Sequence, residues 1–231
     1  GAGIAAATPI VITQSEAGIT SLANASRLAD QASFGATDTL LQEIQAAGPA
    51  PWIASQMAMD VSRYTRGGTD AIHKTTASDF CGAHRLGAGC WRDYYSHEPL
   101  ANDFFRNAIG NPDQLRQRMA LALQQVLVVS SLEVEGTYGL RNWHNLFLAH
   151  AFGNYRQLLQ KVALSPLMGD YLNNVNNHAT QPNENFAREL MQLFTIGTCE
   201  LNLDGSLKGG TCQPTYGNTT VREYAFALTG W

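Results

Sequence analysis

Charged side chains are scarce in this 231-residue chain. Only 15% of its residues are Asp, Glu, Lys or Arg, against roughly 25% in average soluble proteins. Three lysines and twelve arginines leave a formal net charge of -4, whereas a protein that binds a nucleic-acid backbone needs a concentrated basic face. We therefore expect no nucleic-acid partner. Uncharged polar side chains must therefore cover most of the surface, and the chain has 15 Asn and 14 Gln residues.

Long apolar runs are also missing. None approaches the roughly 20 residues that a helix needs to cross a bilayer, so no membrane span is predicted. The chain starts with Gly, and residues 1–15 carry no charge. A signal peptide has a basic region before its apolar stretch, so on this interpretation any export signal has already been removed. We expect residues 1–25 to form an extended N-terminal segment.

Cysteine occurs only four times, in two local pairs. Eight residues separate Cys81 from Cys90, and twelve separate Cys199 from Cys212, whereas zinc sites favour tight C-x-x-C clusters. Two local disulfides are the simplest interpretation. Free thiols are the alternative, because four cysteines allow three pairings and the sequence does not choose among them. If the disulfides form, the protein works in the periplasm or outside the cell.

The spacing of apolar residues predicts a mainly α protein, a multi-helix bundle-like domain over residues 26–231. The expected helices cover residues 38–47, a short stretch around Trp52, and then 111–127, 140–151, 155–164, 184–194 and 220–230. Asn111 with Pro112 is the expected N-cap and first helical residue of the third helix. Asn154 is the expected cap of the helix at 155–164. A capping box from Thr220 to Glu223 is the expected start of the last helix.

Two stretches depart from the helical pattern. Residues 63–98 hold the first cysteine pair among glycines and aromatic residues, which indicates an irregular insertion tied by a disulfide. The segment Cys199 to Cys212 alternates apolar and polar residues and then reaches Asp204-Gly205. Such a pattern predicts a short β-hairpin.

Several sequence runs are similar to one known family in order and spacing. They are Ala32 to Thr37, Leu115 to Leu123, His150 to Arg156, Pro182 to Gly197 and Ala227 to Trp231. Together they resemble the bacterial domain of unknown function 1800 over residues 26–231, apart from the Cys81 to Cys90 excursion. The Asn-Glu-Asn-Phe-Ala-Arg-Glu-Leu-Met motif at 183–191 is the most specific of these features.

The resemblance implies an exported, largely helical bacterial protein, often encoded beside a partner that resembles alkaline phosphatases and sulfatases. It implies no settled activity. Family members continue well beyond the Thr-Gly-Trp motif, so the resemblance implies that this chain is an N-terminal half whose partner is the missing C-terminal half. Whether Trp231 is a natural or a proteolytic end stays open.

The 183–191 motif supplies the candidate catalytic residues Glu184 and Glu189. Glu184 and Arg188 are i,i+4 neighbours on one helix, as are Asn185 and Glu189, which fits a surface ion pair as well as a site. Glu184 also lies in the first helical turn, where the helix dipole favours a carboxylate. Glu189 borders the apolar face, so a buried carboxylate there needs a partner. His150, on a neighbouring predicted helix, is the expected partner and the third candidate.

A divalent metal is one hypothesis for these residues. The expected ligands are His150 and Glu189, with His178 or Glu223 as a further one, because ligands in helical bundles converge from several elements. The sequence has no H-E-x-x-H and no Glu-x-x-His, the spacings that place two ligands on one helical face. A buried histidine bonded to a carboxylate is the commoner outcome, and the capping box already accounts for Glu223.

A hydrolase that acts on an extracellular polymer such as a polysaccharide is a second hypothesis. Glycoside hydrolysis needs two facing carboxylates, but Glu184 and Glu189 are five positions apart and point to different faces of their helix. Exposed aromatic residues at 91–95 would suit sugar stacking, although residues beside a disulfide are more often local core. The chain has no G-x-S-x-G motif.

A structural or binding role is the third hypothesis and the one we favour. A neutral surface with local disulfides suits an exported protein of the cell envelope, and such a surface can pack against copies of itself with little charge repulsion. A homo-oligomer is therefore possible on this interpretation. Asn185, Arg188 and Glu223 would then form a polar network that ties the helix to the rest of the chain.

Overall fold

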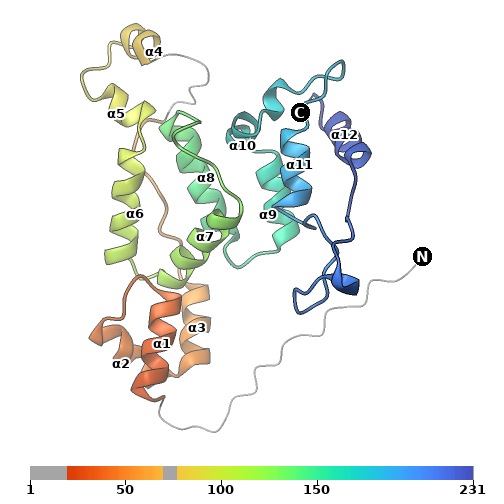
Figure 1. Ribbon diagram of the computed structural model, residues 1–231. Coiled ribbons are helices and arrows are strands. Elements are labelled where there is room, and N and C mark those ends of the chain that lie inside the picture. Colours follow the sequence, from red (N-terminus) through yellow and green to blue (C-terminus); the bar gives the residue numbers. More distant parts are fainter. Residues whose placement is uncertain (1–19, 70–76, 231) are drawn as a thin grey trace.

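The computed structural model describes residues 20–69 and 77–230, which are mainly helical (Figure 1). Its α-helices are α1 Leu22–Ala32, α2 Asp38–Ala47, α3 Pro49–Ala58, α4 Ala77–Ala83, α5 Cys90–Tyr95, α6 Glu98–Gly110, α7 Gln114–Val126, α8 Thr137–His150, α9 Tyr155–Ala163, α10 Pro166–Tyr171, α11 Asn185–Gln192 and α12 Asn218–Ala227. Two short 3-10 turns, Asn174–Asn176 and Lys208–Gly210, complete the described elements. The mainly α prediction is confirmed.

The first three helices form one end of the molecule (Figure 1). Ser21 and Thr37 cap α1 and α2 through their side-chain oxygens, and Gly48 joins α2 to α3 with a φ of 82°. Ile44 and Trp52 are the large side chains of this core. Helix α2 has the predicted bounds. Helix α1 begins inside the segment expected to be extended, whose residues 1–19 lie outside the described residues.

The middle of the molecule is built from α6, α7 and α8 (Figure 1). Helix α8 packs closely on α7, and Trp143 and Phe147 lie in the main hydrophobic core. The expected helix start at Asn111-Pro112 is wrong: Asn111 ends α6, and α7 begins after Asp113. Asp113 does not cap its helix, because its carboxylate binds a backbone N–H elsewhere.

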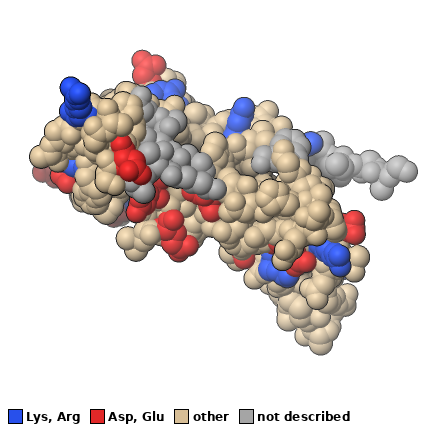
Figure 2. Space-filling view, turned by 90° about the horizontal axis from the view of Figure 1, so that it is seen from above, with Lys and Arg blue, Asp and Glu red and all other residues tan. Residues whose placement is uncertain are grey.

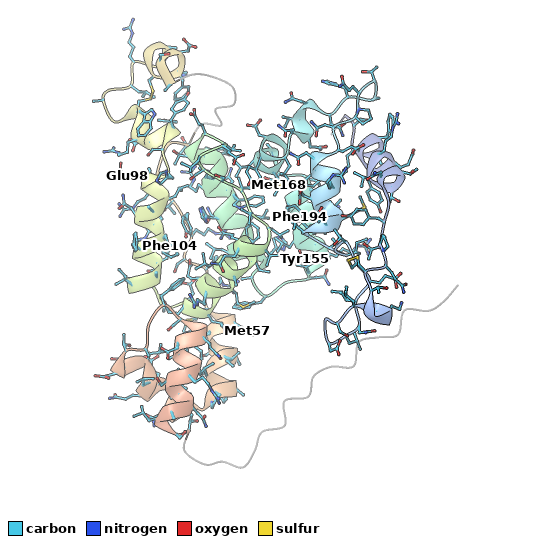
Figure 3. All side chains as sticks on the ribbon, in the orientation of Figure 1. Met57, Glu98, Phe104, Tyr155, Met168 and Phe194 are labelled. Atoms are coloured by element: carbon cyan, nitrogen blue, oxygen red, sulfur yellow. A yellow bond between two sulfur atoms is a disulfide. The ribbon has the colours of Figure 1, made fainter. Side chains whose placement is uncertain are left out.

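Helices α9 to α12 form the other side of the molecule (Figure 1). The predicted Asn154 cap of α9 is confirmed, since its side chain accepts from two backbone N–H groups. Tyr155 donates a hydrogen bond from its hydroxyl to the carbonyl oxygen of Phe194 at 2.7 Å, which links α9 to the end of α11 (Figure 3). The predicted capping box is wrong, because α12 starts at Asn218 and leaves Glu223 exposed.

Both predicted disulfides are present. Cys81 is bonded to Cys90 and Cys199 to Cys212. The insertion at 63–98 is less irregular than expected, because the first disulfide joins two short helices, α4 and α5. Residues 70–76 of the insertion lie outside the described residues. The hairpin at 199–212 is not confirmed: the turn forms, but the described backbone there makes isolated antiparallel bridges rather than paired strands.

Charged side chains are sparse on the surface as well. Seen from above, charged side chains form small scattered groups among uncharged residues, and some of these groups contain both Lys or Arg and Asp or Glu (Figure 2). Among residues 20–69 and 77–230, no helix is long and apolar enough to cross a membrane. The two disulfides are compatible with an oxidising compartment.

Candidate functional site

The polar residues of α11 form a half-exposed surface pair and a separate amide contact. Arg188 donates to a carboxylate oxygen of Glu184 at 2.9 Å, and each side chain is 40% exposed. Asn185 donates from its Nδ2 atom to the Oδ1 atom of Asn173 at 3.0 Å. The Glu184–Arg188 contact is therefore the expected i,i+4 ion pair. Such pairs contribute little to stability.

Glu189 behaves differently from Glu184 on the same helix. Its Oε2 atom is buried and has no hydrogen-bond partner. It shares no hydrogen bond or ion pair with His150 in the described part of the chain, and His150 is half-buried at the end of α8. His178 and Glu223 are exposed. Within the described residues, no three His, Cys, Asp or Glu side chains come together as metal ligands would.

A buried polar network, which the sequence analysis did not find, lies at the centre of the molecule. We call residues 59–69 the crossing segment, because they run along α6 and across α7 and α8 without regular secondary structure. Asp113 Oδ2 accepts from Ser62 N at 2.9 Å. Asn145 binds both the N–H and the carbonyl oxygen of Tyr64 at 2.9 Å. These side chains form hydrogen bonds with the backbone of the crossing segment, which has no neighbouring β-strand to pair with among the described elements.

Asp103 is a fully buried acid of this network. Its side chain has no exposed area, and its Oδ1 atom lies 3.1 Å from Arg66 Nε and 3.0 Å from Arg106 Nη1. Its Oδ2 atom accepts from the backbone N–H groups of Thr65 and Arg66. Arg141 of α8 donates to the carbonyl oxygen of Arg66 at 3.1 Å. These contacts pair the buried charge and fix the path of the crossing segment.

The crossing segment places Tyr64 against His144 of α8. The two rings are stacked, 4.5 Å between centroids and 5° between planes. His144 Nδ1 is buried without a hydrogen-bond partner. Burial lowers the pKa of His144 from 6.5 to about 4. Burial, and secondly the charge of Asp103, raise the pKa of Tyr64. Both side chains are therefore neutral at pH 7.

His144 lines a cavity of about 320 Å³ between α6, α7, α8 and the loop that joins the last two. We call it the His144 cavity. Its apolar and aromatic walls are Leu100, Ala101, Phe104, Phe105, Val129, Leu140 and Trp143, and its polar lining residues are His97, Gln124, Ser131 and His144. Phe104 is labelled on α6 in Figure 3. Ligand sites are commonly apolar pockets of this size with a few polar groups and a titratable residue of shifted pKa.

The aromatic residues at 91–95 were considered either as a surface for sugar stacking or as part of the local core, and the structure separates them. Tyr95 is buried, and Tyr94 packs against Phe80 with ring centroids 4.9 Å apart. Trp91 is 60% exposed on α5, directly after the disulfide-bonded Cys90. The local-core interpretation thus holds for the two tyrosines. It does not hold for the tryptophan.

A protein-family model matches most of the chain. The model of a family described as "Protein of unknown function (DUF1800)" matches residues 27–231. This is the family that the sequence motifs resemble. Comparisons with curated proteins and with solved structures gave no match.

Proposed function

The chain belongs to the DUF1800 family, and we propose that it is an exported binding protein of the cell envelope whose His144 cavity receives a ring-bearing, uncharged ligand group. The observation that carries this proposal is the cavity itself, with a neutral and unsatisfied imidazole in its wall. The two disulfides support export. A C-terminal half and association with further copies of the chain belong to the same proposal.

The size of the cavity sets the size of the ligand group. An apolar cavity of about 150 Å³ holds a benzene molecule, so 320 Å³ gives room for a fused two-ring group. Phe104, Phe105 and Trp143 supply aromatic surface for it. Aromatic pairs gain about 0.5–1.5 kcal/mol beyond the burial of their area.

The state of His144 sets the polarity of the ligand group. With Nδ1 enclosed, Nε2 is the ring nitrogen left for a ligand. In a neutral imidazole Nε2 accepts a hydrogen bond in one tautomer and donates one in the other. A hydroxyl group satisfies either tautomer. A carboxylate gains less, because the imidazole carries no charge at pH 7.

Calorimetric titration with two matched probes tests this proposal. We expect 2-naphthol to bind, and to bind about fivefold tighter than naphthalene, because one added hydrogen bond contributes about 1 kcal/mol. His144→Phe keeps a ring against Tyr64 and should remove the difference between the probes. His150→Gln, on the same helix but outside the cavity lining, should leave both affinities unchanged. Failure of both probes to bind overturns the proposal.

A hydrolase based on a carboxylate or a divalent metal is the second candidate. The buried, unpartnered Oε2 atom of Glu189 favours it, since such an atom is left for a ligand to satisfy. Elemental analysis of the purified chain, followed by the same measurement on Glu189→Gln, tests the metal form. We expect bound metal to fall in Glu189→Gln and to persist in Glu184→Gln. Equal metal content in the two variants contradicts this candidate.

A further inference from the structure

We propose that a second pocket, where α5 meets the start of α6, binds an uncharged saccharide. The pocket has a volume of about 630 Å³, and its walls include Arg66, Arg92, Asp93, Tyr94, Glu98 and Asn102. Glu98 is labelled at the α5 end of α6 in Figure 3. None of these residues lines the His144 cavity, so the two sites can succeed or fail separately.

Both guanidinium groups of this pocket are already paired with carboxylates. Arg92 donates to both carboxylate oxygens of Asp93, at 2.8 and 3.0 Å. Arg66 Nε lies 3.1 Å from the buried Asp103. The hydrogen bonds from Arg92 also lower the pKa of Asp93, so this acid stays ionised. An anion would have to compete with these carboxylates for the guanidinium groups.

A sugar hydroxyl suits such a surface better than an anion does. It donates to a carboxylate and accepts from a guanidinium N–H at the same time, so it can use both members of an Arg–Asp pair without separating them. Asn102 and Glu98 add an amide and a further carboxylate to the wall. The pocket therefore offers donors and acceptors side by side, with no large excess of one charge.

An exposed indole lies on the same helix as three residues of the pocket wall, Arg92, Asp93 and Tyr94. Trp91 lies three positions before Tyr94 on α5, and residues at this spacing are neighbours on a helix surface. Trp91 is 60% exposed. A flat aromatic face next to planar polar groups can stack against the C–H face of a sugar ring while the polar groups hold its hydroxyls.

The rim of the pocket is fixed without a ligand. A Cβ atom at Gly68 would overlap the Tyr94 ring, so only glycine allows this close approach. Gly68 N also donates to the carbonyl oxygen of Asp93 at 2.6 Å. The Cys81–Cys90 bridge holds the start of α5, directly before Trp91. A preformed site loses less conformational entropy on binding.

Affinity electrophoresis tests the proposal on the whole chain. Native gels would contain hydroxyethylcellulose, galactomannan or laminarin as uncharged polysaccharides, and alginate as an acidic one. We expect at least one uncharged polymer to retard the chain, and Trp91→Ala to weaken that binding by about tenfold or more, the range of an aromatic hot spot. Tyr224→Ala is the matched control, because Tyr224 is an aromatic residue that is 48% exposed on α12 and lines neither this pocket nor the His144 cavity.

Two further measurements make the result decisive. Arg92→Gln should also weaken retardation, with an unchanged circular dichroism spectrum, since it removes donors at an exposed position. Trp91→Ala should leave 2-naphthol binding unchanged, which separates this site from the His144 cavity. Retardation by alginate alone, equal loss in Trp91→Ala and Tyr224→Ala, or no retardation by any uncharged polymer each overturns the proposal.

Discussion

The α1–α3 end of the molecule and the crossing segment over α6–α8 are stabilised by different kinds of contact. Ser21 and Thr37 cap their helices through backbone N–H groups three residues further on. In the crossing segment, Thr65 bonds to Asp103 and Tyr64 to Asn145, partners 38 and 81 residues away. Removing a contact should therefore lower the free energy of unfolding only slightly in the first region. In the second region the decrease should be large, because a buried polar group is left without its partner.

The largest expected effect is that of Asp103→Ala. The change leaves two backbone N–H groups and the guanidinium groups of Arg66 and Arg106 without their carboxylate. Breaking a buried ion pair by removing one partner costs about 3–5 kcal/mol. Urea unfolding followed by circular dichroism measures the loss. An effect of only about 1 kcal/mol would mean that the crossing segment does not depend on Asp103.

The next effect is a dependence of stability on pH caused by His144. Its pKa is about 4 in the folded chain and 6.5 as an unperturbed group, because burial disfavours the charged ring. Above pH 6.5 both states are neutral. As the pH falls from 6.5 towards 4, the unfolded chain takes up a proton that the folded chain does not, so the free energy of unfolding falls.

This dependence amounts to about 3 kcal/mol in total, at about 1.4 kcal/mol for each pH unit, and levels off below pH 4. Urea titrations between pH 7 and pH 4 measure it. His144→Phe keeps the aromatic stack and should remove this part of the slope, while His150→Gln should retain it. The same slope in both variants would assign the dependence to other groups.

A smaller effect is expected at the other end of the molecule. Thr37→Ala removes the side-chain oxygen that accepts from Leu40 N at 3.2 Å at the start of α2. Loss of an N-cap of this kind costs about 1 kcal/mol. Thermal unfolding should show a small decrease in Tm. The control is Thr39→Ala, because Thr39 is an exposed residue within α2 that does not cap the helix. A loss as large as that of Asp103→Ala would remove the contrast between the two regions.

This contrast also explains how much of the fold the sequence predicts. Helix α2, the Asn154 cap of α9 and both disulfides depend on residues close in the chain, and all were predicted. Helix α6 was missed because its buried face carries Asp103 and Asn107 while large apolar side chains of the same helix are exposed, which breaks the expected apolar stripe.

In the candidate site, too, contacts between residues close in the chain were predicted and contacts between distant residues were missed. The Glu184–Arg188 pair is four residues apart and was predicted from spacing alone. The His144 cavity draws its walls from three helices and a loop, and Tyr64 reaches it from a segment interpreted as irregular. His144 carries no motif, and its properties come from burial among residues distant in sequence. No local pattern could have identified it. The division into an N-terminal segment and one helical domain stays a prediction.

The smallest expected effect is that of Glu184→Gln. Its carboxylate is 40% exposed and its ion pair with Arg188 is of the i,i+4 kind, which contributes about 0.3–0.5 kcal/mol on a helix surface. Urea unfolding at low salt should show a loss of this size, and 0.5 M sodium chloride should reduce it, because salt screens exposed charges. A loss of several kcal/mol that is insensitive to salt would instead place Glu184 in a buried network like that of Asp103, and the polar residues of α11 would then resemble the crossing segment rather than the α1–α3 end.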